Sequence, residues 1–330
     1  MNKDIMFTII MPIYNVRKDY LYAAFDSISR QTYRNFELII VIDGANKETS
    51  TAIREYNFKG INTTIISQEN KGQYISRING LKKAKGDYIF FFDSDDLLTK
   101  NALLILNNLI IKYRSDVIIY SLPRFYNDES DMVEVPHFFE EGVIEKDTVI
   151  DELLKLHSNN ICSKCAKGDL LSTETSFVDE KLRNGEDLGQ ATRLILSADS
   201  FYYTKENIYL YRDNQESREY YDTRNIHNVN FPVPMYRDIF INNSQYEDKK
   251  PLFKASVINS VIRDSFLICR FNKNKKEKYL LLDELNKQEI VKILKSLNCK
   301  APLLSEFVFS LLTNRFYSLL NLLAYIYPVK

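Results

Sequence analysis

The chain has 330 residues, 45% of them hydrophobic and 27% charged, a composition that argues against intrinsic disorder and is sufficient for about two folded domains. Lysine plus arginine and aspartate plus glutamate both total 44, and a net charge of zero argues against a nucleic-acid-coating protein. The zero conceals an asymmetry, because residues 231–330 hold 16 basic and nine acidic residues. The preceding body is therefore acidic and the end of the chain is basic.

The first 120 residues alternate between apolar runs and segments with helical spacing. Strands are predicted at Phe7–Ile13, Phe36–Ile42, Thr63–Ser67, Tyr88–Phe92 and Val117–Tyr120. Helices are predicted near Leu21–Ile28, Lys47–Tyr56, Gln73–Ala84 and Ala102–Tyr113. Strands that are apolar throughout and separated by helices are typical of a mostly parallel sheet with helices on both faces. The pattern predicts an α/β, Rossmann-like fold.

The pattern changes along the rest of the chain. Residues 131–212 mix short strand-like and helical pieces, and the segment after residue 231 is helical in pattern. Helices are predicted there at Leu252–Phe271, Leu280–Leu297 and Leu303–Tyr325. The glycines agree with this division, because none of the nine follows Gly189. We predict an α/β domain at residues 1–230 and a helical add-on domain at residues 231–330.

The sequence has no recognisable targeting or membrane-spanning segment. Its N-terminus has one lysine, a short apolar stretch and no small-residue cleavage site. The best candidate for a spanning helix, residues 316–327, is shorter than the roughly 20 residues that cross a bilayer. Four cysteines in a chain of this length indicate reduced thiols. We therefore expect a cytoplasmic protein.

Polar clusters follow three of the predicted strands. They are Tyr14-Asn15, Asp43-Gly44 and Asp93-Ser94-Asp95. In open parallel sheets, ligands bind outside the carboxyl ends of the strands. The three clusters are therefore predicted to converge on one edge of the sheet.

The strongest local signal is the acidic sequence that ends the fourth strand. On an extended backbone, Asp93 and Asp95 point the same way, and Asp96 adds a third negative charge. Carboxylates this close repel each other, so the arrangement favours a bound cation, and oxygen ligands suit Mg²⁺ or Mn²⁺. The alternative is that these residues cap a helix beginning near Leu97. The sequence has neither a Walker lysine loop nor a G-x-G-x-x-G motif, so a metal would have to neutralise a phosphorylated ligand.

A second acidic pair precedes a predicted helix at Leu188–Leu196. Gly185 gives a flexible entry to Glu186-Asp187. A carboxylate in this position is kept ionised by the helix dipole, which suits a general base. The alternative is an ordinary helix-start acid.

Several of these segments, in their order, resemble the inverting GT-A glycosyltransferases of family 2. The closest stretches are TIIMPIYN, SISRQTYRNFELIIVIDG and AKGDYIFFFDSDD, within residues 5–120. The resemblance continues more loosely through Lys164, Asp187 and Arg212 to about residue 215. Lys164 and Arg212 either face the acceptor or the diphosphate, or are solvated charges. The resemblance implies a GT-A fold for the first domain.

The resemblance also implies a nucleotide site at the sheet edge. Pro12 and Tyr14 would line a uracil pocket, and Asp43 would hold the base or the ribose. Gly72 and Arg77 would lie in the segment that closes over the nucleotide.

The same resemblance implies the metal ligand and the base. Asp93-Ser94-Asp95 would be the D-x-D motif, with Asp93 and Ser94 at the nucleotide and Asp95 on Mn²⁺ or Mg²⁺. Asp187 would be the catalytic base. The family usually has two aspartates where this chain has Ile42-Asp43, so one nucleotide contact departs from its pattern.

The implied function is metal-dependent, inverting transfer of a hexose from a UDP-sugar. The sugar would be glucose, galactose or an N-acetyl form, and the acceptor a hydroxyl of a growing glycan, on a polysaccharide, a lipid-linked carrier or a surface protein. One alternative is a catalytically silent nucleotide-sugar-binding subunit that supports a partner transferase. Intact Asp93, Asp95 and Asp187 favour the enzyme. A nucleotidyltransferase is a weaker alternative, because its N-terminal glycine- and lysine-rich loop is absent.

The basic end of the chain leaves two alternatives. Residues 273–278 form a lysine cluster, and Leu303–Tyr325 is an aromatic-rich helix. One interpretation is a membrane-surface helix, which would place the protein peripherally on the inner face of the membrane. The other is a helical add-on that packs on the first domain or forms a homo-oligomer. The helix has Arg315 and Glu306 as its only charges, which favours packing or oligomerisation.

Overall fold

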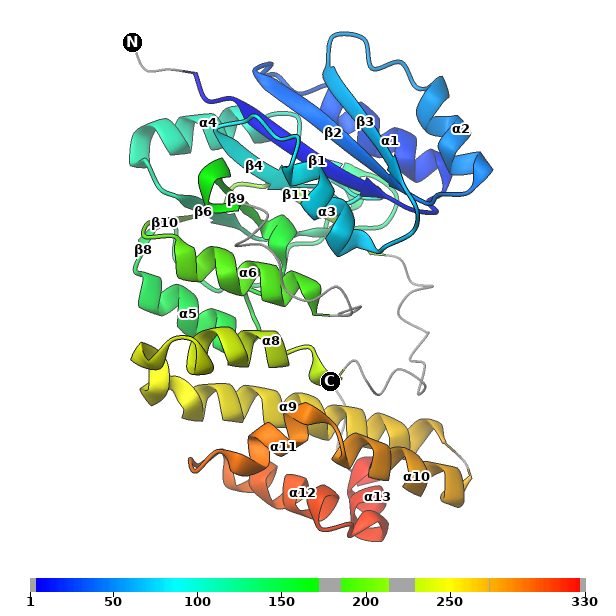
Figure 1. The fold of residues 1–330 in the computed structure, drawn as a ribbon, viewed down its shortest axis with the longest axis vertical. Helices are drawn as coiled ribbons and strands as arrows, with labels where there is room; N and C mark the ends of the chain where they lie inside the picture. Colours follow the sequence, from blue (N-terminus) through cyan, green and yellow to red (C-terminus); the bar gives the residue numbers. More distant parts are fainter. Residues whose placement is uncertain (1–3, 172–184, 214–228, 273, 327–330) are drawn as a thin grey trace. The chain divides into compact units, whose positions relative to one another are not determined.

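The computed structural model describes residues 4–171, 185–213, 229–272 and 274–326 (Figure 1). The chain forms two compact units, of which the first comprises residues 1–149, 160–181 and 193–215. The second comprises residues 150–159, 182–192 and 216–330. The division at residue 230 expected from the sequence stays a prediction.

A mixed sheet is the centre of the first unit. Within the described residues its strand order is β3-β2-β1-β4-β9-β6-β10-β8. The strands are β1 (Phe7–Ile13), β2 (Phe36–Asp43), β3 (Asn62–Gln68), β4 (Tyr88–Phe91), β6 (Val117–Tyr120), β8 (Gly142–Ile144), β9 (Lys164–Lys167) and β10 (Phe201–Thr204). Strands β1 to β4 pair in parallel, which confirms the predicted α/β architecture.

Strand β9 was not predicted from the sequence. It runs antiparallel between β4 and β6, with Cys165 opposite both Phe90 and Ile118. Its four residues, Lys164–Lys167, begin and end with lysine, so no apolar run marks the segment. Its place in the sheet depends on the neighbouring strands rather than on its own pattern.

The helices of the first part of the chain follow the predicted order. They are α1 (Lys18–Ser29), α2 (Lys47–Glu55), α3 (Gln73–Leu81), α4 (Ala102–Tyr113), α5 (Lys146–Leu154) and α6 (Glu186–Ser197). Helix α3 packs on β1 and β2. A Cβ atom added at Gly80 would lie 2.5 Å from Cγ2 of Ile10, so the glycine allows the helix to approach the sheet.

A small second sheet lies beside the large one in the first unit. Its strand order is β5-β11-β7. The strands are β5 (Leu97–Leu98), β11 (Tyr209–Arg212) and β7 (Arg124–Phe125). Leu97, Phe125 and Leu210 form a buried apolar cluster between them. The sheet joins the segment after β4 to a strand more than a hundred residues later in the chain.

The end of the chain is helical, as predicted. The helices are α8 (Val233–Tyr236), α9 (Lys250–Phe271), α10 (Lys275–Asn286), α11 (Glu289–Ser296), α12 (Leu303–Thr313) and α13 (Tyr317–Ile326). The long helix α9 contacts α10, α11, α12 and α13 (Figure 1). None of the described helices is both long enough and apolar enough to cross a membrane.

Two predicted helices of this region are each divided in two. The segment 280–297 breaks at Lys287-Gln288, between α10 and α11. The segment 303–325 breaks where Arg315 takes a φ of 63°, between α12 and α13. Neither break contains glycine or proline, so the local sequence gave no signal for the end of a helix at these positions. At the second break, Asn314 Nδ2 donates back to Ser310 O at 2.9 Å, and Tyr317 Oη donates to Asp283 of α10 at 2.6 Å.

Gly80→Ala tests the close approach of α3 to the sheet. We expect it to lower the free energy of unfolding by about 1–3 kcal/mol, because the added methyl overpacks Ile10. Denaturant unfolding of Gly80→Ala, Ile10→Ala and the double variant measures the coupling. In an open helix, alanine is favoured over glycine by about 1 kcal/mol, so a Gly80→Ala protein that is as stable as wild type or more stable would contradict the packing.

Candidate active site

The three polar clusters predicted at strand ends lie along one edge of the sheet. Ile13 of β1 pairs with Ile42 of β2, and Ile10 of β1 pairs with Phe91 of β4. Because these strands are parallel and in register, the residues that follow them leave the sheet on the same side. The predicted convergence is confirmed.

Asp43 holds the loop that precedes α3. Its side chain is 3% exposed, and Oδ1 accepts hydrogen bonds from Lys71 N and Gln68 Nε2, each at 2.8 Å. Oδ2 accepts from Gly72 N, also at 2.8 Å. Gly72 has a φ of 91° at the N-cap of α3, a conformation that favours glycine. The carboxylate therefore positions the Gly72 segment, and its direct contact with a nucleotide stays a prediction.

Pro12 and Tyr14 differ in their exposure. Pro12 is buried within β1, where it pairs with Val41. Tyr14 lies just beyond the strand end with half of its surface exposed. Its ring is therefore accessible to a planar ligand, whereas Pro12 contributes to the strand beneath.

Arg77 is a partner of Asp93. Its side chain is fully buried in α3, with the guanidinium over the Phe91 ring at 5.7 Å. Nη2 donates to Asp93 Oδ1 at 3.1 Å. Gln73 Nε2, from the first turn of the same helix, donates to the same oxygen at 2.5 Å. Two side chains of α3, Arg77 and Gln73, therefore orient the Asp93 carboxylate. No sequence motif indicated this role of Gln73.

Asp96 connects the acidic loop to strand β11. It is 1% exposed, and its carboxylate accepts from Tyr209 Oη at 2.5 Å and from Arg212 N at 2.7 Å. Tyr209 Oη in turn accepts from Asp93 N at 3.1 Å. The alternative of a helix cap at Leu97 is wrong, since Leu97–Leu98 is strand β5, paired with β11. Asp96 therefore has a structural function.

Arg212 supports the same loop through its side chain. Nε donates to Asp95 O at 2.6 Å, and Nη1 donates to Tyr126 O at 3.0 Å. The guanidinium lies 4.0 Å from the Tyr20 ring and 4.3 Å from the Phe125 ring, two cation–π contacts. Arg212 is buried, so the solvated-charge alternative is wrong for it.

Lys164 is also buried rather than solvated. Its side chain is nearly inaccessible, and Nζ donates to Asn160 O at 2.7 Å and to Ser163 Oγ at 3.0 Å. An ammonium inside a sheet needs such oxygen partners. The residue therefore holds the segment that precedes β9.

The acidic loop concentrates negative charge in a poorly solvated place. Burial, followed by the charge of Asp93, raises the pKa of Asp95 above its ordinary value. Burial and the charges of Asp95 and Asp93 raise the pKa of Asp96 well above its ordinary value. Ionised carboxylates are thus disfavoured here unless a positive charge is supplied. The geometry favours a ligand that brings a cation.

The side chains are compatible with a metal shared with a ligand. Within the described residues, no group of three or more His, Cys, Asp and Glu side chains could hold a metal by itself. Asp96 is engaged by Tyr209 and Arg212, and Asp93 by Arg77 and Gln73, which leaves Asp95 as the principal carboxylate. Ser94 is half-buried beside it. A divalent ion bound by one protein carboxylate would take its remaining oxygens from phosphates and water.

Asp187 lies at the start of α6. It is half-buried in the first helical turn, together with Glu186. Gly185 has a φ of 88°, and a Cβ there would lie 2.6 Å from Cβ of Phe231, so only glycine fits this entry. Asp187 belongs to the second unit. Its catalytic role stays a prediction.

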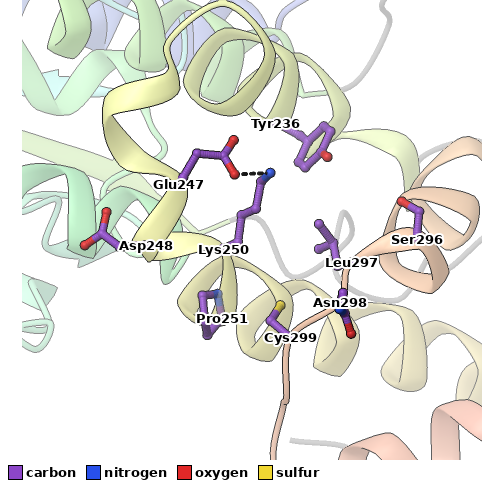
Figure 2. Close-up of a pocket in the computed structure, with 9 residues that line it drawn as sticks. All are labelled: Tyr236, Glu247, Asp248, Lys250, Pro251, Ser296, Leu297, Asn298 and Cys299. Atoms are coloured by element: carbon purple, nitrogen blue, oxygen red, sulfur yellow. Dashed lines mark hydrogen bonds and ion pairs between the residues drawn. The ribbon is translucent and has the colours of Figure 1, made fainter.

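A cavity of about 470 Å³ lies elsewhere in the second unit (Figure 2). It is lined by Tyr236, Glu247, Asp248, Lys250, Pro251, Ser296, Leu297, Asn298 and Cys299. The Lys250 ammonium forms an ion pair with the Glu247 carboxylate, three residues earlier in the chain. None of the residues predicted to bind nucleotide or metal lines this cavity, so it is distinct from the candidate site.

Comparisons with known proteins agree with the α/β fold of the first unit. The model of the family "Glycosyl transferase family 2" matches residues 8–167. The structure is similar to Staphylococcus aureus TarS residues 1–349 in complex with UDP-GlcNAc, with a TM-score of 0.65 at 18% identity, over 88% of this chain and 83% of that one. This likeness concerns the fold. Residues 8–167 thus form a glycosyl transferase family 2 domain.

Curated relatives match over different lengths. Glycosyltransferase GlyA of Streptococcus pneumoniae is 33% identical over 38% of this chain, and the match spans only 18% of GlyA. Glycosyltransferase GlyG of the same species is 28% identical over 63% of this chain and 70% of its own length. Poly(ribitol-phosphate) beta-N-acetylglucosaminyltransferase TarP of Staphylococcus aureus is 29% identical over 70% of this chain and 74% of TarP.

Tyr209→Phe tests the link between the acidic loop and β11. Removing the hydroxyl takes away one of the two hydrogen bonds of the buried Asp96 carboxylate and the acceptor of the Asp93 amide. We expect a loss of about 1–3 kcal/mol in the free energy of unfolding, measured by denaturant titration. The control is Tyr211→Phe, on the same strand but partly exposed, with a change of about 0.5 kcal/mol or less. Equal effects of the two variants would contradict the proposed link.

Asp95→Asn tests the charge on the loop through stability. A carboxylate whose pKa is raised by folding destabilises the native state where it is ionised, and this penalty disappears as the pH falls through the raised pKa. Without metal at neutral pH, we therefore expect Asp95→Asn to have a higher Tm than wild type. The difference should shrink as the pH falls toward 3.8, the ordinary pKa of aspartate. Thermal unfolding across this range in EDTA measures it, and a lower Tm for the variant at neutral pH would refute the charge argument.

Proposed function

We propose that the chain transfers a hexose from a UDP-sugar to a hydroxyl of a cell-surface glycan, with inversion. The observation that carries the proposal is the acidic loop after β4. Burial raises the pKa of the Asp95 carboxyl in this loop, and the hydrogen bonds of Asp96 and Arg212 fix the backbone of the loop. A site of this kind favours a ligand that brings both a divalent cation and phosphate oxygens. The family 2 domain at residues 8–167 supports transfer of a sugar rather than of a nucleotide.

The choice of donor and acceptor class draws on the relatives. TarS was solved with UDP-GlcNAc, which supports a UDP-sugar as donor. TarP is named as a poly(ribitol-phosphate) beta-N-acetylglucosaminyltransferase, and GgaB of Bacillus subtilis as a minor teichoic acid biosynthesis protein. Both names support an acceptor hydroxyl on a cell-surface glycan, whether a polymer, a lipid-linked carrier or a glycoprotein.

The nucleotide would lie at the edge formed by β1, β2 and β4. The exposed Tyr14 ring would contact the uracil, and the Gly72 segment, held by Asp43, would approach the nucleotide with its backbone. Asp93, oriented by Arg77 and Gln73, would face the ribose. Asp95 would hold Mn²⁺ or Mg²⁺, which when bound supplies Lewis-acid stabilisation of the departing diphosphate.

The proposed reaction is a single displacement. The acceptor oxygen forms a bond to the anomeric carbon while the bond from that carbon to the diphosphate oxygen breaks, and UDP leaves with the bonding pair. Asp187 accepts the proton of the acceptor hydroxyl as the attack proceeds. Attack from the face opposite the leaving group inverts the anomeric centre. General-base assistance of this kind contributes about 10²–10⁴-fold to the rate.

Asp187→Asn tests the assignment of the base. We expect transfer to fall by about 10²–10⁴-fold, while UDP-sugar binding measured by calorimetry with Mn²⁺ stays near wild type. The matched control is Glu186→Gln in the same helical turn, which should retain transfer. Loss of nucleotide binding in Asp187→Asn, or near-normal transfer, would remove the residue from the mechanism.

A hydrolysis assay tests the function as a whole. UDP-glucose, UDP-galactose and their N-acetyl forms would each be incubated with the full chain, with Mn²⁺ or with EDTA. We expect one donor to be hydrolysed slowly without acceptor, and hydrolysis to stop in EDTA. Binding of a UDP-sugar without turnover under any condition would instead identify a silent nucleotide-sugar-binding subunit.

A further inference from the structure

Helix α13 is apolar on both of its sides. Its buried side contains Tyr317, Leu320 and Ala324. On the opposite side Leu319, Leu322, Tyr325 and Ile326 are 42–63% exposed, and we call these four the α13 stripe. At 3.6 residues per turn they project in one direction, with Ser318 as the polar residue among them.

Helix α12 also has exposed apolar residues, all of them within its first five positions. Its buried residues include Val308, Phe309, Leu311 and Leu312. Leu303, Leu304 and Phe307 are exposed, Leu303 by 89%, and we call these three the α12 stripe. Leucines and phenylalanines on both sides of a helix are typical of a helix that is covered on both sides.

The neighbouring helix α11 shows the ordinary pattern. Its buried residues are Ile290, Val291 and Leu294, and its exposed side has Glu289, Lys292 and Lys295. Exposed apolar residues are most numerous on α12 and α13, although Phe271 of α9 and Leu280 of α10 are exposed as well. An exposed apolar surface rimmed by polar residues is typical of an interaction site.

Basic residues lie near α13, of which Lys278 is buried and Arg270 half-buried, and the acidic Asp283 bonds to Tyr317 of the same helix. Lys278 Nζ donates to Asn321 Oδ1 at 2.6 Å, and Arg270 Nε donates to Ala324 O at 2.6 Å. Lys275 and Lys276 are exposed at the start of α10, which carries the Tyr279 ring that contacts Tyr317 of α13 at 5.4 Å. From residue 270 to residue 330 the chain has 11 Lys/Arg against five Asp/Glu.

We propose that the α12 and α13 stripes dock on an anionic lipid bilayer. The exposed leucine, isoleucine and phenylalanine side chains insert at the boundary between head groups and acyl chains, and the exposed Lys275 and Lys276 are attracted to anionic lipids. The Tyr325 ring lies at the edge of this surface, because its hydroxyl donates to Cys269 O at 3.3 Å. The two helices would lie in the plane of the surface, because neither they nor the other described helices are long and apolar enough to cross it.

The charge distinguishes a bilayer from a second copy of the chain. In a symmetric dimer, each apolar stripe would meet the same stripe of the partner. The basic residues around it would then face their own copies, and like charges across an interface disfavour association. An anionic bilayer supplies the opposite charge. In the sequence, the low charge of residues 303–325 favoured packing on protein, but the structure buries only one side of each helix.

Vesicle flotation of the full chain tests this proposal. We expect the protein to float with vesicles of phosphatidylcholine plus phosphatidylglycerol, to bind phosphatidylcholine alone much less, and to be released in part by high salt. The combined variant Leu319→Gln, Leu322→Gln and Ile326→Gln should lower the partition coefficient at least about tenfold, because three exposed apolar side chains no longer insert. Lys275→Glu combined with Lys276→Glu should lower binding to the anionic vesicles.

The control variant is Ile241→Gln, which replaces an isoleucine of the second unit with a similar exposed fraction, 66% against 63% for Ile326. It should float like wild type, and near-UV circular dichroism checks that each variant is folded. The lysine variant keeps the test decisive if the glutamine variant fails to fold.

Wild-type protein that does not float would overturn the proposal, as would a folded glutamine variant that binds like wild type. A dimer in sedimentation velocity that the glutamine variant dissociates, without vesicle binding, would identify a second copy as the occupant. The proposal does not depend on the activity of the first unit.

Discussion

The hydrogen bonds of the buried Asp96 carboxylate are the interaction on which the candidate site depends. Through Tyr209 and the Arg212 amide, this side chain joins the loop after β4 to strand β11. The Arg212 guanidinium then holds the Asp95 carbonyl, and the Tyr209 hydroxyl accepts from the Asp93 amide. Two carboxylates that would repel each other on a free loop are thereby kept on a fixed backbone. This preorganisation supports the proposal of a site with few metal ligands of its own.

The rest of the first unit brings a ligand to this loop. Parallel pairing places the ends of β1, β2 and β4 at one edge, and Asp43 fixes the Gly72 loop beside them. The concentrated negative charge destabilises the site when it is empty, as the raised pKa of Asp95 indicates. Such a site gains most from the ligand that neutralises it, which is why a cation and a diphosphate suit it together.

The sequence predicted the fold more completely than it predicted the contacts within the fold. The apolar runs at Phe7–Ile13 and Val117–Tyr120 predicted their strands to the residue, because a strand buried on both faces is mostly apolar. Thr8 is the polar exception in the first run, and its hydroxyl donates to Glu37 at 2.7 Å. Strand β9 and the breaks after α10 and α12 were not found. Strand β9 is a segment bounded by lysines that forms a strand only between its two neighbours. The break after α12 coincides with the long-range hydrogen bond of Tyr317 to Asp283.

The sequence by itself determined the architecture and the edge of the sheet on which the polar clusters meet, and it predicted the acidic loop as the place of chemistry. These follow from local periodicity and from where strands end. Only the tertiary structure decided what each charged residue does. Asp96 and Arg212 support the acidic loop, and Arg77 is a buried partner of Asp93. The tertiary structure also decided which apolar residues of α12 and α13 are exposed. The reason is distance along the chain. Asp96 and Tyr209 are 113 residues apart, and no local pattern contains a contact that exists only once the chain has folded.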